Sequence, residues 1–131
     1  MSTPPALLRM VELSGAEAMW LLEGGGLGRL VLVRRELTTV RPARHVWEYG
    51  RLIIRTPVPS RAATYQVDEI RAVPGTGWTV TVSGPAEVIT DPHEAAHHQR
   101  ALPGWTHGPH DTLLRLHPKA VAGFRLARAV G

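Results

Sequence analysis

The chain has 131 residues, of which 44% are hydrophobic and 20% charged, and it contains no cysteine. This length fits a single domain over residues 1–131, and the lack of cysteine excludes disulfides, thiolate metal sites and a cysteine nucleophile. The net charge is +4, and all but one of the 15 basic residues are arginine, the exception being Lys119. Because guanidinium groups suit phosphates and carboxylates, we expect an anionic small-molecule ligand.

The sequence contains no targeting or membrane segment. No charged stretch precedes an apolar run near the N-terminus, and no segment approaches the roughly 20 apolar residues of a membrane span. We therefore expect a cytoplasmic protein with no membrane partner, in which residues 1–12 form a flexible N-terminal arm. The arginines are dispersed and no helix-turn-helix, zinc-finger or ribonucleoprotein motif occurs, which disfavours a nucleic-acid partner.

The first predicted elements are a helix and a hairpin. Ser14 begins a capping box, which predicts a helix over residues 15–23 that three glycines end. Residues 28–33 and 37–41 are extended runs separated by a charged turn, and they predict a β-hairpin. Pro42 cannot donate to a strand ladder, so the second strand is predicted to lie at an edge or to carry a bulge there.

Short apolar runs and turn sequences alternate through the middle of the chain. Several of these runs alternate apolar with polar side chains, as half-buried strands do. The predicted strands cover residues 45–47, 52–56, 63–68, 78–83 and 86–90, with a break at Gly84-Pro85.

The last predicted elements are a helix and two strands. Asp91 supplies an N-cap acid before a proline, which predicts a helix that ends near Leu102. Strands are then predicted over residues 113–117 and 124–128. The whole series, six or seven strands with two short helices, favours a mainly β fold built as an antiparallel barrel. Because so few strands leave exposed edges, we also expect dimerisation.

Five segments occur in a characteristic order along the chain, followed by a tryptophan. They are Gly28-Arg29-Leu30, Arg41-Pro42-Ala43, Gly50 to Thr56, Gly77-Trp78-Thr79-Val80 and Gly84 to Pro92, and the tryptophan is Trp105. This series, over roughly residues 13–126, resembles the pyridoxamine 5′-phosphate oxidase-like family. The resemblance implies an FMN-binding split barrel that forms a homodimer with two cofactor grooves at the interface, FMN being replaced in some members by deazaflavin or haem.

The resemblance also implies which residues bind the cofactor. The flavin ring is expected beside Arg41, Pro42, Ala43 and Arg44, with Trp105 as a further ring contact. The phosphate is expected at Arg55, Thr56, Ser60 and Arg61. Two guanidinium groups and two hydroxyls around a proline-stiffened turn suit a phosphate independently of the resemblance, although without the resemblance two solvated charges near a turn would be the commoner explanation. Relatives usually have a lysine and a connecting helix at this point, whereas here a strand follows Arg61 almost directly.

Three functions follow from these observations. The first is an FMN- or deazaflavin-dependent oxidoreductase acting on an unidentified small molecule, for which no catalytic side chain is assigned because the cofactor carries the hydride chemistry. The alternative is a member that has lost flavin and acts as a cofactor-free enzyme or small-molecule-binding module. The third is a nucleic-acid or protein-interaction module.

One predicted helix carries a pair of histidines that could bind a metal. His93 and His97 are spaced i, i+4 on this second predicted helix, next to His98, but such a pair on a short helix more often belongs to a solvated face. We therefore expect a solvated helix face and no metal site. The other histidines, which could include a proton donor, are His45, His107, His110 and His117.

Overall fold

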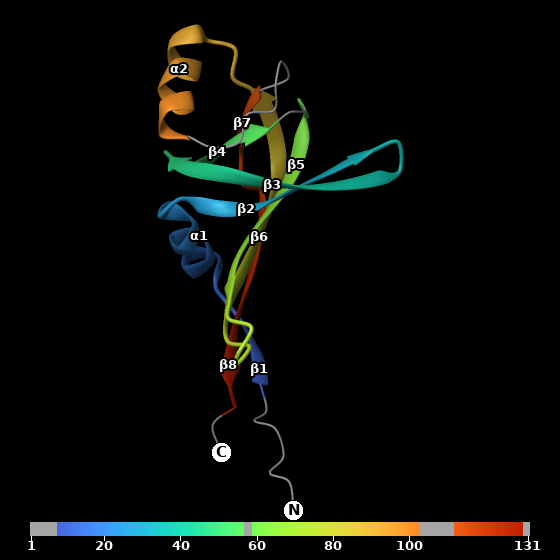
Figure 1. The fold of residues 1–131 in the computed structure, drawn as a ribbon, viewed down its shortest axis with the longest axis vertical. Helices are drawn as coiled ribbons and strands as arrows, with labels where there is room; N and C mark the ends of the chain where they lie inside the picture. Colours follow the sequence, from blue (N-terminus) through green and yellow to red (C-terminus); the bar gives the residue numbers. More distant parts are fainter. Residues whose placement is uncertain (1–7, 57–58, 103–111, 130–131) are drawn as a thin grey trace, which may run out of the picture.

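The computed structural model describes residues 8–56, 59–102 and 112–129 of the chain. It contains eight strands and two helices, which Figure 1 shows along the chain. The strands are β1 (Leu8–Glu12), β2 (Gly26–Arg34), β3 (Leu37–Glu48), β4 (Arg51–Thr56), β5 (Ala62–Ile70), β6 (Gly77–Val88), β7 (Thr112–Leu116) and β8 (Ala120–Arg128). The helices are α1 (Gly15–Glu23) and α2 (Pro92–Ala101).

Six of the strands close a barrel. The hydrogen-bonded order is β6-β5-β2-β3-β4-β7, and β7 pairs with β6 to complete the ring, while β8 and β1 extend the sheet from β6. Every pairing is antiparallel. The predicted mainly β fold, an antiparallel barrel with two short helices, is therefore confirmed. Strand β1 was not predicted.

Strand β6 changes partner along one edge. It pairs with β8 over residues 77–83 and with β7 over residues 86–88, while its other edge stays paired with β5. The break predicted at Gly84-Pro85 is thus a change of partner within a continuous strand. This change splits the sheet, because β7 turns into the barrel while β8 continues away from it.

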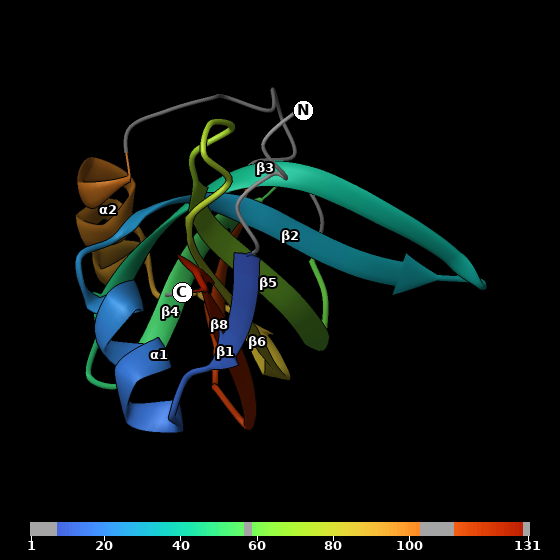
Figure 2. The same cartoon turned by 90° about the horizontal axis from the view of Figure 1, so that it is seen from below.

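The helices and the β2–β3 hairpin lie on opposite sides of the barrel. Both α1 and α2 are on the left in Figures 1 and 2, and the hairpin projects to the right. Ser14 caps α1 by accepting a hydrogen bond from the backbone N–H of Glu17, and Asp91 caps α2, as predicted. Neither helix in the described part of the chain has the length and apolar character needed to cross a membrane.

Two apolar clusters hold the barrel and the helices together. The barrel interior is filled by aliphatic side chains around Tyr65, and α1 buries Ala18 and Leu22 against it. A smaller cluster lies under α2 and contains Ile53, Ile89, Leu102 and Leu113. Residues on β4 therefore face two different environments, the barrel interior and the underside of α2.

The edge predicted at Pro42 is also confirmed. Among the described residues, residues 37–44 of β3 pair only with β2, His45 pairs with both β2 and β4, and residues 46–48 pair with β4. The free edge and the exposed hairpin residues Val33, Leu37 and Val40, each more than half exposed, form an apolar projection.

Candidate functional site

The residues predicted to hold a phosphate lie at the end of β4 and the start of β5. Arg55 and Thr56 are the last two residues of β4, and Ser60 and Arg61 directly precede β5. Residues 57–58 between them are outside the described ranges. The structure therefore brings the two pairs to neighbouring places in the barrel wall.

The four side chains do not converge on one point. Thr56 is 1% exposed and shares the barrel-facing side of β4 with Leu52 and Ile54, whereas Arg55 points to the side under α2. The Nη1 of Arg55 donates to the carbonyl oxygen of Leu102, the C-cap of α2, at 2.9 Å. Arg55 thus binds the C-terminal end of this helix, where a cation is favoured.

Ser60 and Arg61 line a groove. Its volume is about 480 Å³, and its walls are Pro59, Ser60, Arg61, Ala86, Glu87 and Val88. The guanidinium of Arg61 is exposed, and the Ser60 hydroxyl donates to the carbonyl oxygen of Ala62 at 2.5 Å. The backbone of Arg61 accepts a hydrogen bond from the Ala86 N–H at 2.8 Å, so β6 holds this rim in place.

Glu87 brings a negative charge to the same groove. Its Oε1 accepts a hydrogen bond from Nη1 of Arg115 at 3.0 Å. The same oxygen lies 3.0 Å from Nε2 of His117. These two partners lower the pKa of Glu87 below its usual value, Arg115 contributing most. The carboxylate is therefore ionised but compensated within its own ion cluster, which leaves Arg61 as a positive charge at the rim.

The predicted ring-binding segment lies on the hairpin side of the barrel. Arg41, Pro42 and Arg44 are exposed on β3, whereas Ala43 is 2% exposed and points into the core. Side chains alternate along a strand, so Pro42 and Arg44 share the outer face. This outer face could contact a ring, and Ala43 could contribute only its backbone.

A buried hydrogen-bonded pair lies beneath this segment. His45 Nδ1 is 2.9 Å from the Tyr65 hydroxyl, His45 Nε2 is 2.9 Å from the Leu22 carbonyl oxygen, and the hydroxyl is 3.0 Å from the Ala43 carbonyl oxygen. Burial lowers the pKa of His45 and raises the pKa of Tyr65, so both side chains are neutral near pH 7. Since a carbonyl can only accept, Nε2 of the neutral imidazole carries the proton and Nδ1 is an acceptor. The single proton of the Tyr65 hydroxyl is therefore shared between two acceptors, Nδ1 of His45 and the Ala43 carbonyl oxygen.

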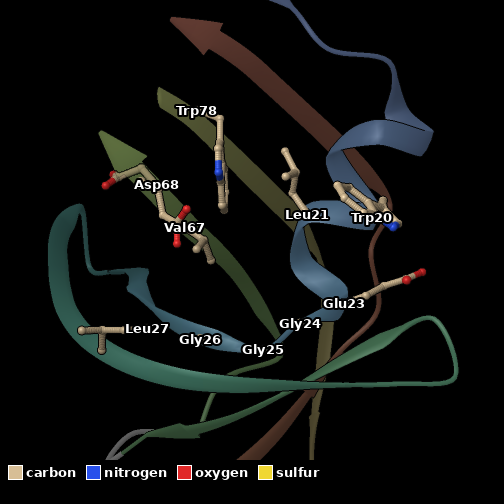
Figure 3. A pocket seen from close by; sticks show the side chains of 11 residues that line it. Trp20, Leu21, Glu23, Gly24, Gly25, Gly26, Leu27, Val67, Asp68 and Trp78 are labelled. Carbon is tan, nitrogen blue, oxygen red and sulfur yellow. The ribbon is translucent and has the colours of Figure 1, made fainter. Parts of the chain in front are cut away.

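A separate cavity of about 860 Å³ lies between α1 and strands β2, β5 and β6 (Figure 3). Trp20 and Trp78 line it, together with the acidic residues Glu23, Asp68 and Glu69. Asp68 is bound by Arg29 at 2.9 Å, but the other two acids leave the rim negative. Such a rim repels a phosphate, and of the predicted cofactor residues that the structure describes, none lines this cavity.

The remaining predicted residues divide into exposed, buried and undescribed ones. His93 and His97 are exposed on α2, as expected of a solvated face, but the prediction is wrong for His98, which is 1% exposed because it faces the barrel. Trp105, His107 and His110 lie outside the described residues. The sequence did not reveal the His45–Tyr65 pair, because only the strand register brings these two residues together.

Comparison with known proteins places the chain in a family. It matches the family model described as pyridoxamine 5′-phosphate oxidase over residues 14–127. An uncharacterized protein of Mycobacterium tuberculosis (strain ATCC 25618 / H37Rv), Rv0080, is 32% identical over 138 aligned positions, covering 95% of this chain and 91% of that protein.

Solved structures share the fold. One from Corynebacterium glutamicum ATCC 13032 Kitasato, provisionally named a pyridoxamine 5′-phosphate oxidase, matches with a TM-score of 0.75 and 23% identity, covering 91% of this chain and 99% of its own. The FAD binding protein from Mycobacterium smegmatis matches with a TM-score of 0.65 and 25% identity, covering 90% and 98%. The barrel, the order of its segments and the match over residues 14–127 show that this chain belongs to the pyridoxamine 5′-phosphate oxidase-like family.

Proposed function

We propose that this protein is a homodimeric flavoprotein that binds FMN and oxidises or reduces a small molecule. Family membership supports a flavin, since the Mycobacterium smegmatis relative binds FAD. When bound, a flavin supplies transfer of a hydride or of single electrons, and the protein supplies binding and orientation. The residues of this chain must therefore hold a phosphate and present a surface to a planar ring.

The groove beside Ser60 and Arg61 is the observation that carries this proposal. It combines an exposed guanidinium with a hydroxyl at a backbone rim that β6 fixes, and its volume of about 480 Å³ accommodates a phosphate with part of a ribityl chain. The carboxylate in the groove, Glu87, is held by Arg115 and His117. These residues fit a phosphate monoester, with Arg61 as its charged ligand.

The outer face of β3 fits the ring. Pro42 and Arg44 are exposed there, on the stretch of β3 that pairs with β2 alone. A guanidinium plane can stack on an aromatic ring or donate to its carbonyl oxygens. The same free edge and the apolar hairpin lie where a second subunit would cover the ring.

The first test is an FMN titration followed by absorbance between 300 and 550 nm. We expect wild-type protein to bind FMN, and Arg61→Ala to weaken binding about 10- to 100-fold, because one charge-assisted hydrogen-bonding group is lost. Arg71→Ala is the matched control, since it removes an exposed arginine from the opposite end of β5. Equal binding by wild type and Arg61→Ala would contradict the phosphate assignment, and no binding of FMN at all would contradict the proposed cofactor.

The proposed homodimer is inferred from the apolar projection on the β2–β3 hairpin. Val33 is 70% exposed and Val40 is 55% exposed, and both lie on the β2–β3 hairpin away from the barrel core. An exposed apolar patch next to a free strand edge is typical of an interface. We expect light scattering to give twice the 14.3 kDa mass of the chain, and the double variant Val33→Lys, Val40→Lys to give the monomer mass.

Val73→Lys is the control for this experiment. Val73 is 88% exposed in the turn before β6, so it tests whether any added surface lysine alters association. A monomeric wild type, or a hairpin double variant that stays dimeric, would contradict the proposed interface.

A cofactor-free binding module is the second candidate. It is favoured by the placement of Arg55 and Thr56, of which one binds the end of α2 and the other faces the barrel interior. Only half of the four predicted phosphate ligands thus line the groove. If FMN, FAD, deazaflavin and haem all fail to bind while an anionic small molecule binds in the groove, this second function replaces the first.

A further inference from the structure

Helix α2 carries a buried histidine whose ring nitrogens make no hydrogen bond to the described residues. His98 is 1% exposed, and neither its Nδ1 nor its Nε2 makes a hydrogen bond to any described residue. Buried polar side-chain atoms in folded proteins almost always have a partner. An imidazole with two unpartnered nitrogens therefore indicates that something else binds at this position.

Two carboxylates approach the ring without bonding to it. Oε2 of Glu48, at the end of β3, lies 3.4 Å from Nδ1, and Oε1 of Glu94, one turn earlier in α2, lies 3.7 Å from Nε2. A charge-assisted N–H···O bond is about 2.7–2.9 Å long, so both separations are longer than such a bond. A cation bound by Glu48 and His98 together would satisfy one nitrogen and the carboxylate.

His97 supplies a third donor group. One possible ligand atom from each of Glu48, His97 and His98 lies within 4.8 Å of the other two. Zinc bonds to imidazole nitrogen and carboxylate oxygen are about 2.0–2.2 Å long, which places tetrahedral ligands about 3.4 Å apart. Because His97 is exposed, a rotation of its side chain can bring its ligand atom from the 4.8 Å limit to the shorter ligand separation without disturbing the core.

The two glutamates differ in their charge environment. Glu94 forms an ion pair with Arg115 of β7, and Arg115 also binds Glu87 at 3.0 Å. Glu94 is thus compensated by a guanidinium, whereas the described charged partner of Glu48 is His98 itself. A cation at Glu48 would balance that carboxylate, so Glu48 is the better ligand of the two.

We propose that Glu48, His97 and His98 bind a divalent transition-metal ion of the zinc type. Two imidazoles and one carboxylate are a common protein ligand set for such ions, with water in the remaining position. The ion would fix the middle of α2 to the end of β3, two segments that lie side by side in Figure 1. This site differs from the His93–His97 helix pair considered from the sequence, because it uses the buried His98 and a residue 50 positions earlier in the chain.

The test is a zinc titration of the full chain, prepared without a histidine tag and treated with a chelator. Isothermal titration calorimetry is expected to give one Zn²⁺ per chain, and thermal unfolding is expected to shift to higher temperature on adding the ion. Cobalt(II) in place of zinc should give the visible absorption bands of a four-coordinate site. No binding of either ion by the wild type would overturn the proposal.

Variants identify the ligands. Glu48→Gln and His97→Ala change side chains that are not fully buried, and each is expected to weaken Zn²⁺ binding at least tenfold and to abolish the cobalt bands. His93→Ala, on the same helix, is the matched control and should bind as the wild type does. Binding that survives both ligand variants, or that is lost in His93→Ala, would place the metal elsewhere and overturn the assignment.

Discussion

Replacing Gly84 with alanine is expected to lower the free energy of unfolding by about 3 kcal/mol or more. A Cβ atom at this position would overlap the carbonyl oxygen of His117 and crowd the backbone nitrogen of Lys119. The site is where β6 changes partner, so the backbone between β7 and β8 passes close over it. The expected loss is the cost of pushing these two segments apart.

The neighbouring backbone cannot move away cheaply. Two hydrogen bonds flank Gly84, from His117 N–H to the Pro85 oxygen and from Lys119 N–H to the Ser83 oxygen, each 2.9 Å long. Urea unfolding of Gly84→Ala measures the effect, with Gly15→Ala as control because a Cβ there has no neighbour within 4 Å. The control should stay within about 0.5 kcal/mol of wild type. A Gly84→Ala variant as stable as the control would show that the backbone of residues 117–119 does not lie in close contact with Gly84.

Local signals predicted most of the fold. Caps at Ser14 and Asp91 located both helices, and alternation located the strands of the barrel. Strand β1 was missed because all five of its residues are exposed and it pairs with β8 alone, so no buried face leaves a pattern in the sequence. The partner change at Gly84 was mistaken for a strand break because glycine and proline interrupt the alternation there, although pairing with β5 continues to Pro85.

The site was predicted less completely, because it depends on the direction in which each side chain points and on the register of the paired strands. Arg55 and Thr56 are adjacent on one strand, and adjacent strand residues point to opposite faces, so they could not both reach one phosphate. The groove could not be foreseen, because Arg61 meets Glu87 there only through the pairing of β5 with β6. Likewise, Glu48 and His98 meet only when α2 packs against the barrel.

Removing the hydroxyl of Tyr65 is expected to cost about 2 kcal/mol of stability. Tyr65 is fully buried, and its hydroxyl is the donor within reach of both His45 Nδ1 and the Ala43 carbonyl oxygen. Tyr65→Phe keeps the ring but leaves these two acceptors without that donor, and a buried acceptor without a partner carries its desolvation cost. Urea unfolding measures the change. Tyr49→Phe makes the same chemical change at a side chain that is 87% exposed, and it should have little effect.

The pH dependence of stability tests the protonation state on which this prediction rests. Burial lowers the pKa of folded His45, whereas the unfolded chain binds a proton on this residue at about pH 6.5. As the pH falls below about 6.5, the unfolded state therefore holds more protons than the folded state, and stability decreases towards the lower folded pKa. His45→Gln retains a donor and an acceptor but does not titrate, so its free energy of unfolding should fall less between pH 7.5 and 5.5. Equal slopes for wild type and His45→Gln would mean that burial does not shift the pKa of His45. A wild type that gains stability relative to His45→Gln as the pH falls would mean that His45 is charged in the folded protein, with Nδ1 donating to Tyr65.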